Sequence, residues 1–87
     1  MKEKSVVVNH PVGLHARPAA VFVQSAQKFS SKLTVSSNGR SVNAKSLLGI
    51  LSLGVTSGTE IWLYADGLDE VEAIQTLAAI VDTNFGE

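Results

Sequence analysis

The sequence predicts an α+β fold, a two-layer sandwich in which helices cover one face of an antiparallel sheet and the other face meets solvent. Three observations lead to this class. The predicted segments follow the order βαββαβα, only one tight hairpin is evident, and the other connections carry helical segments. The 87 residues suffice for one domain with a single core, so we expect one domain over residues 1–87.

The first half of the chain predicts a strand, a helix and a hairpin. Residues 5–8 are strand-like and residues 9–13 are loop-like. A helix entered at Ala16 has apolar side chains at helical spacing. These are Ala16, Ala19, Ala20, Val23 and Ala26, with Phe22 and Phe29 flanking them. Residues 33–37 alternate as a strand before Asn38-Gly39, a pair that favours a hairpin turn because both turn positions need a positive φ, and residues 40–43 return as the partner strand.

The second half predicts a short helix, a strand and a long helix. Ser46 is a good N-cap for a helix over residues 47–53, which Gly54 closes. Residues 59–65 alternate as a strand, and a turn follows at Asp66-Gly67. Asp69 and Glu72 resemble a capping box at the start of the last helix. The apolar stripe of that helix consists of Val71, Ile74, Leu77, Ala78, Val81 and Phe85.

Composition excludes several classes of function. The net charge of −1 gives no general attraction to nucleic acid or to anionic membranes, and no apolar run approaches the roughly 20 residues of a membrane span. With no cysteine there is neither a disulfide framework nor a thiol metal site. The first residues do not look like a signal peptide, so we expect a cytoplasmic protein. We expect no cofactor and no metal, and we take His10 as a solvated loop residue.

The run from Gly13 to Ala20, Gly-Leu-His-Ala-Arg-Pro-Ala-Ala, carries the main chemical signal. Pro18 fits only the first turn of a helix, which places His15 at or near the N-cap. The backbone amides of Ala16 and Arg17 would then face an anion, and the Arg17 guanidinium adds donors suited to phosphate oxygens. The same positive field disfavours the imidazolium form, which leaves a neutral nitrogen able to attack phosphorus. The alternative for His-x-Arg alone is an ordinary loop histidine ahead of a helix.

Ser46 and the apolar helix that follows it form a second candidate site. A serine before a helix is often only a cap, but a phosphoryl group there would also meet the helix dipole and the amides of Leu47 and Leu48. The apolar side chains at 47, 48, 50 and 51 cannot all face inward on so short a helix, so some should form an exposed apolar patch. We take Ala20, Leu47, Leu48 and Leu51 as candidate partner-binding residues.

Two separated motifs resemble one family. Residues 13–20, together with Ser-Val-Asn-Ala-Lys-Ser-Leu-Leu-Gly-Ile-Leu-Ser-Leu-Gly at 41–54, look like the HPr family, the histidine-containing phosphocarriers of the bacterial sugar phosphotransferase system. The resemblance covers essentially the whole chain. It implies an open-faced sandwich with three helices on one face and strand order 1-4-2-3. The sequence around Gly49 looks more like the Gram-positive branch than the enteric one.

The resemblance also implies roles for individual residues. His15 would accept phosphate from enzyme I through Nδ1 and pass it to sugar-specific enzyme IIA domains, with Arg17 stabilising the phosphate. The chain would be a carrier rather than an enzyme. Ser46 would be the regulatory phosphorylation site of an HPr kinase/phosphorylase, and the product would serve a LacI-type catabolite repressor as corepressor. His15 itself excludes a paralogue that resembles HPr but lacks the active histidine.

Some residues depart from the family pattern, and two other classes are open to test. Val12 stands where many members have threonine, Leu47-Leu48 replaces a common Ile-Met, and Trp62 is unusual. An acyl-carrier-like domain would use Ser46 to hold phosphopantetheine, but such carriers are strongly acidic and helical. A small RNA- or protein-binding module would need a better stacking platform and a basic stripe. Mass spectrometry distinguishes an acid-labile phosphate, a pantetheine adduct and no modification.

Overall fold

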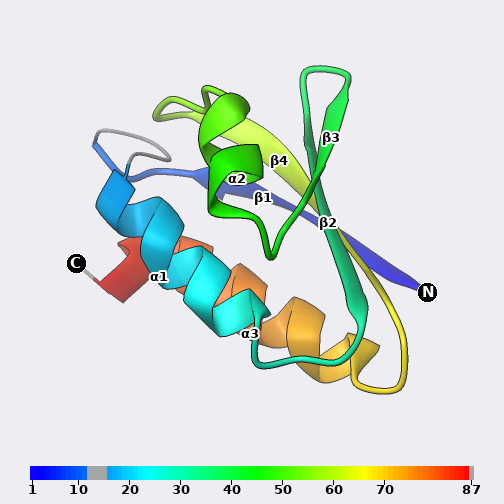
Figure 1. Ribbon diagram of the computed structural model, residues 1–87. Coiled ribbons are helices and arrows are strands. Elements are labelled where there is room, and N and C mark those ends of the chain that lie inside the picture. Colours follow the sequence, from blue (N-terminus) through cyan, green and yellow to red (C-terminus); the bar gives the residue numbers. More distant parts are fainter. Residues whose placement is uncertain (12–15, 87) are drawn as a thin grey trace.

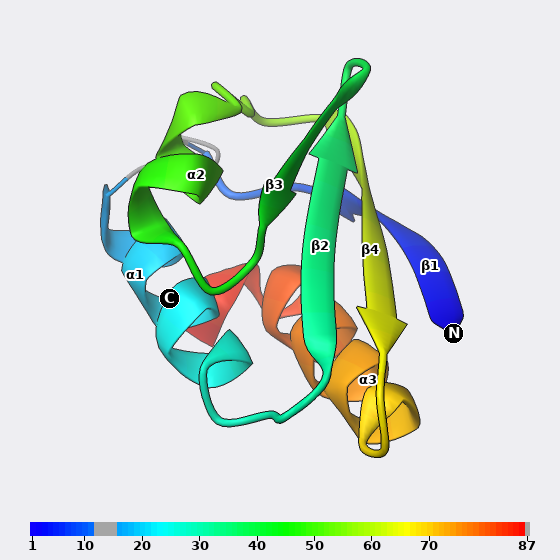
Figure 2. The same ribbon diagram turned by 45° about the vertical axis from the view of Figure 1, so that its right-hand side comes forward.

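A four-stranded antiparallel sheet forms one layer of the computed structural model, which describes residues 1–11 and 16–86. The strands are β1 (Lys2–Val8), β2 (Lys32–Ser37), β3 (Arg40–Asn43) and β4 (Thr59–Asp66), in the order β1-β4-β2-β3. The described helices are α1 (Ala16–Ala26), α2 (Leu47–Ser52) and α3 (Glu70–Asp82), followed by the 3₁₀ turn η1 (Asn84–Gly86). The strand order is visible in Figure 2, where α3 lies behind β2 and β4. The predicted fold class, element order and strand order are confirmed.

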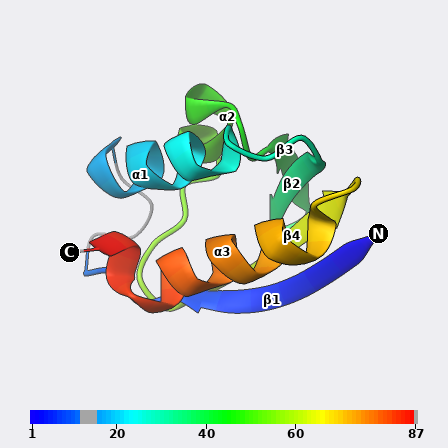
Figure 3. The same ribbon diagram turned by 90° about the horizontal axis from the view of Figure 1, so that it is seen from below.

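Successive side chains along a strand alternate between a buried face and an open face of the sheet. In β4 the side chains of Ile61, Leu63 and Ala65 are buried, whereas Trp62 between them is exposed. β4 pairs with β1 on one side and with β2 on the other, so its buried residues lie at the centre of the core. The helices cover this buried face, as the view from below shows (Figure 3).

The β2–β3 hairpin turns where the sequence predicts it. Asn38 has φ 52° and Gly39 has φ 81°, the pair of positive angles that a two-residue hairpin of this twist requires. Ser37 and Arg40 face each other as the last pair of the ladder. The register of this hairpin is therefore set by local turn chemistry.

The helix faces agree with the predicted stripes except at their ends. α1 buries Ala19, Phe22, Val23 and Ala26, so Phe22 belongs to the core rather than to its flank, while Ala16 is exposed. α3 buries Ala73, Ile74, Leu77, Ala78 and Val81. The prediction was wrong for Val71, which is 49% exposed in the first turn of α3, and Phe85 lies beyond the helix in η1.

The predicted capping box of α3 was wrong, because Asp69 bonds to another part of the chain. Asp69 occupies the N-cap position but makes no side-chain cap bond. Its carboxylate accepts hydrogen bonds from the Ser30 amide at 2.9 Å, from the Ser31 amide at 3.0 Å and from the Ser31 hydroxyl. The Ser31 hydroxyl, followed by the Ser30 amide, lowers the pKa of Asp69 to about 2. Asp69 thus ties the start of α3 to the loop before β2.

Gly67 allows the turn before α3 to approach that same loop. A Cβ at this position would lie 2.7 Å from Ser31 Cα and 2.5 Å from Ser31 Oγ, closer than real Cβ contacts. The carboxylate that contacts this turn is that of Glu70 rather than Glu72, since Glu70 Oε1 accepts a hydrogen bond from the Gly67 amide at 3.3 Å. Glu70 also forms an ion pair of 3.0 Å with the amino terminus, which lowers the pKa of Glu70.

Candidate functional site

The first turn of α1 positions Arg17. α1 begins at Ala16, and the side chain of Arg17 is exposed while the following Pro18 and Ala19 are buried. The first turn contains no acidic residue, so no carboxylate of that turn offsets the positive end of the helix dipole. His15 directly precedes Ala16 in the sequence but lies outside the described residues, so its placement next to Arg17 stays a prediction.

Ser46 is the N-cap of α2, as predicted. Its backbone is extended, with φ −108° and ψ 115°, and its Oγ accepts a hydrogen bond from the Gly49 amide at 3.1 Å. The first bond within the helix joins the Ile50 amide to the Ser46 carbonyl at 3.0 Å. A Cβ on Gly49 would lie 3.2 Å from Ser46 Oγ, so glycine leaves the cap hydroxyl the space it needs. The helix ends at Ser52, one residue earlier than predicted, with Leu53 as its C-cap.

Side-chain bonds fix α2 at both ends. Near its start, Lys45 Nζ donates to the Phe29 carbonyl at 2.6 Å, and Gln27 Nε2 donates to the Lys45 carbonyl at 3.1 Å. At its end, Arg40 Nη1 donates to the Ser52 carbonyl at 2.7 Å. These bonds attach a helix of six residues to the end of α1 and to the hairpin, although its length alone would give it little stability.

An apolar patch lies on α2, next to α1. Leu47 is 41% exposed and Leu48 is 81% exposed, whereas Ile50 is fully buried. Leu51 is half-buried against the core, and Ala20 is half-buried on α1. The two helices are in contact, and Figure 1 shows them side by side. The expected exposed patch is confirmed for Leu47 and Leu48; its role in binding is not tested by the geometry.

The prediction that His10 is a solvated loop residue was wrong. His10 is only 8% exposed, and its ring meets that of Phe85 edge to face, with centroids 6.0 Å apart and an interplanar angle of 68°. Phe85 approaches from η1, so the contact joins residues that are 75 positions apart in the sequence. No local pattern around His10 indicates it.

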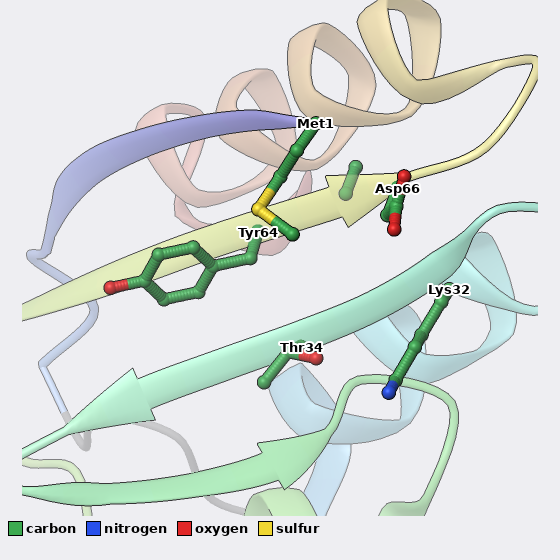
Figure 4. A pocket seen from close by; sticks show the side chains of 6 residues that line it. Met1, Lys32, Thr34, Tyr64 and Asp66 are labelled. Atoms are coloured by element: carbon green, nitrogen blue, oxygen red, sulfur yellow. The ribbon is translucent and has the colours of Figure 1, made fainter.

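The open face of the sheet carries a separate feature. The rings of Trp62 and Tyr64 stack there, with centroids 6.4 Å apart. Beside Tyr64 is a hollow of about 210 Å³, lined by Met1, Lys32, Thr34, Tyr64, Ala65 and Asp66 (Figure 4). This hollow lies across the sheet from the helices that carry Arg17 and Ser46, so it is not part of the candidate phosphate site.

Neither a metal cluster nor a membrane span is found in the described part of the chain. Within residues 1–11 and 16–86, no three acidic or histidine side chains gather where they could hold a metal ion. None of the helices in these ranges is both long and apolar enough to cross a bilayer.

Comparisons with known proteins identify the family. A family model described as "PTS HPr component phosphorylation site" matches residues 2–83. The HPr-like protein Crh of Bacillus subtilis is 49% identical over 81 residues, which cover 93% of this chain and 95% of Crh. The crystal structure of HPr-C-His from Thermoanaerobacter tengcongensis superposes with a TM-score of 0.97 at 50% identity, covering 100% of this chain and 98% of that one.

The chain is also similar to a second crystal structure from this family. The phosphocarrier protein HPr of Bacillus anthracis gives a TM-score of 0.89 at 44% identity, over 92% of this chain and 95% of that one. The matched region contains both motifs that the sequence singles out, since it spans residues 2–83. Together with the sheet order and the capped α2, these matches show that the chain belongs to the HPr family of phosphocarrier proteins, which are carriers and not enzymes.

Proposed function

We propose that this chain, as a single domain over residues 1–87, accepts a phosphoryl group on His15 from enzyme I and passes it to sugar-specific enzyme IIA domains in the cytoplasm. The observation that carries the proposal is the sequence His15-Ala16-Arg17 at a helix that begins at Ala16, with Arg17 exposed in its first turn. Membership of the phosphocarrier family supports it, since the matched family model is named for a phosphorylation site.

The chemistry needs a nucleophile, a means to stabilise charge and a bond that can be broken again. A ring nitrogen of His15 attacks phosphorus, the new nitrogen–phosphorus bond forms, and the bond from phosphorus to the donor breaks. Arg17 and the amides at the start of α1 stabilise the oxygens that gain charge. A nitrogen–phosphorus bond is readily transferred onward, as a carrier requires.

We further propose that Ser46 is a regulatory phosphorylation site for an HPr kinase/phosphorylase. The hydroxyl lies at the helix start, where a phosphate would meet the positive end of the dipole. A relative of known structure, Crh, is named the "Catabolite Repression HPr" of Bacillus subtilis, which supports a role in catabolite repression. The LacI-type repressor is the partner that the family resemblance implies. Leu47 and Leu48 would lie in that contact and set its specificity.

One experiment tests the carrier proposal. The protein is incubated with enzyme I and phosphoenolpyruvate, and the phosphate is located by mass spectrometry under mild conditions. We expect one acid-labile phosphate on His15, absent from His15→Ala and present on Ser46→Ala. Phosphate on His15→Ala at the wild-type rate would contradict the assignment.

A further inference from the structure

We propose that the open face of the sheet is a docking site for an arginine-rich, extended segment of a partner protein. Four residues form this site, which we call the acidic aromatic strip: Glu3 on β1, and Glu60, Trp62 and Tyr64 on β4. None of them takes part in the proposed phosphoryl transfer, so the inference does not depend on that function.

Strand alternation and pairing bring the four residues to the face that the helices leave uncovered (Figure 2). Along β4, Glu60, Trp62 and Tyr64 alternate with buried residues and therefore point to the other side of the sheet. Glu3 lies directly opposite Tyr64 in the register of β1 with β4. A carboxylate thus flanks the aromatic pair both along β4 and across to β1.

The two rings provide a surface on which a cation can stack. Their centroids lie 6.4 Å apart with an interplanar angle of 23°, and Trp62 is 40% exposed. In Figure 4 the Tyr64 side chain points back along β4, away from Asp66. Tryptophan is the best aromatic partner for a cation over its face, and arginine fills that place more often than lysine. Exposed aromatic side chains are also enriched at protein interfaces.

The carboxylates of the strip favour the same kind of partner. Glu3 and Glu60 are exposed, and within the part of the chain that the structure describes neither carboxylate has a hydrogen bond or an ion pair. Lys2 and Lys4 alternate with Glu3, so they point to the other side of β1. Both charged members of the strip are therefore acidic and free to meet a cationic group.

Farther along β4, opposite charges offset each other. Lys32 lies directly opposite Asp66 in the register, and both line the hollow beside Tyr64 (Figure 4). The charge that a partner would meet is therefore concentrated at Glu3 and Glu60, beside the rings.

An extended segment matches the spacing of the strip. Alternate residues of an extended chain point to one side and repeat about every 6.6 Å, close to the 6.4 Å between the two ring centroids. An Arg-x-Arg segment can therefore place one guanidinium over each ring. The remaining donors of each guanidinium are then available to the carboxylates beside the rings.

The same charges disfavour other occupants. Bases of a nucleic acid stack on aromatic rings, but the carboxylates repel its phosphates, and they repel an anionic lipid surface in the same way. A second copy of this chain docked through the same strip would bring acidic groups against acidic groups.

The test uses Trp62 as its own reporter, because it is the only tryptophan of the chain. The full-length protein is titrated with an Arg-Ser repeat peptide of about ten residues, blocked at both ends, and the emission of Trp62 is followed. Gln-Ser and Glu-Ser repeat peptides of the same length are the controls for charge. Calorimetry repeats the titration with each variant, including Trp62→Ala, which lacks the reporter.

Two double variants separate the position of the charges from the net charge. Glu3→Gln/Glu60→Gln removes both carboxylates of the strip. Glu72→Gln/Asp82→Asn is the matched control, because it removes as many negative charges from exposed positions of α3, on the covered side of the sheet. The melting temperature of every variant verifies that it is folded.

We expect the Arg-Ser peptide to shift the emission of Trp62 saturably, and the Gln-Ser and Glu-Ser peptides to leave it unchanged. Glu3→Gln/Glu60→Gln and Trp62→Ala should each weaken binding about tenfold, whereas the control pair should bind within about twofold of wild type. Equal weakening by the two charge pairs, equal binding of the Gln-Ser peptide, or no saturable shift would overturn the docking site. A concentration-dependent dimer that Trp62→Ala abolishes would also overturn it, since a second copy would then cover the strip.

Discussion

Arg17 lies where a guanidinium can act on phosphate at little structural cost. Its side chain is exposed in the first turn of α1, and neighbouring Pro18 and Ala19 carry the packing. An exposed charged side chain contributes little to stability but can stabilise charge that develops on a transferring phosphoryl group.

Arg17→Ala should therefore lower phosphotransfer on the order of 10²-fold, while the free energy of unfolding changes by no more than about 0.5 kcal/mol. The phosphotransfer rate of Arg17→Lys should lie between those of wild type and Arg17→Ala, since lysine keeps the charge but loses the planar fork of donors. Stopped-flow or quenched phosphorylation by enzyme I and thermal melting provide the two measurements. Unchanged transfer in both variants would remove Arg17 from the mechanism.

Asp69 gives the fold a dependence on acid pH. Its pKa is lowered from 3.8 to about 2 in the folded chain, first by the Ser31 hydroxyl and then by the Ser30 amide. A group whose pKa is lower in the folded state stabilises it above the unfolded pKa, and this stabilisation is lost as the pH falls through the folded pKa.

The unfolding free energy of the wild type should thus decrease between about pH 4 and pH 2, and Asp69→Asn should show a smaller decrease over the same window. Urea titrations at several pH values measure both. Asp66→Asn, which removes an exposed carboxylate nearby, is the control and should keep the wild-type slope. Parallel curves for wild type and Asp69→Asn would contradict the role of the Ser30–Ser31 bonds.

For single residues, sequence patterns predicted the contacts that are local in the chain and missed those between distant segments. Ser46 was identified because an N-cap is bonded within its own turn, to Gly49 three residues later. Asp69 also looked like a cap, but its carboxylate bonds to Ser30 and Ser31, 39 and 38 residues away. The burial of His10 against Phe85 is likewise a long-range contact, and a single sequence carries no signal for it.

Among the elements, α2 combines a regulatory hydroxyl with an exposed apolar patch. Ser46 caps the helix, and the exposed Leu47 and Leu48 follow it directly. Aspartate is also a good N-cap, and its charge is favourable at a helix start, so Ser46→Asp should leave the helix in place. A hydrated charge beside an apolar contact nevertheless opposes burial of that contact.

We expect Ser46→Asp to weaken binding of enzyme I about tenfold even with His15 unphosphorylated, while the melting temperature stays near that of wild type. Ser41→Asp adds the same charge to an exposed position of β3 and should bind normally. Titration calorimetry at low and high salt measures the effect. Normal binding of Ser46→Asp, or NMR spectra that show disrupted helices, would refute a docking surface at α2, and an effect abolished by salt would favour direct charge repulsion instead.

The elements themselves were predictable where periodicity and local turn chemistry agree. The alternation in β4 and the Asn38-Gly39 turn place both strands of the hairpin and the face of β4 correctly. The ends were less predictable. Val71 fits the apolar stripe of α3 but is 49% exposed in its first turn, and Phe85 fits the same stripe although the chain leaves the helix at Thr83.

For the whole molecule, the fold keeps α1, which carries Arg17, and α2, which Ser46 caps, on the covered side of the sheet and leaves the other face of the sheet open. α1 and α2 contact each other across from the Trp62–Tyr64 stack. The class and element order followed from the residues, whereas the strand order 1-4-2-3 came from the family resemblance, because antiparallel crossovers of this length allow several orders.

A carrier must release its phosphoryl group as well as accept it, and a chase experiment measures this directly. The protein is labelled with enzyme I and radioactive phosphoenolpyruvate, purified, and mixed with an enzyme IIA domain in the absence of enzyme I. We expect the label to leave His15 and to appear on the enzyme IIA domain, with no release from a protein labelled only on Ser46. Label that stays on the chain in the presence of active enzyme IIA domains would contradict a phosphocarrier function.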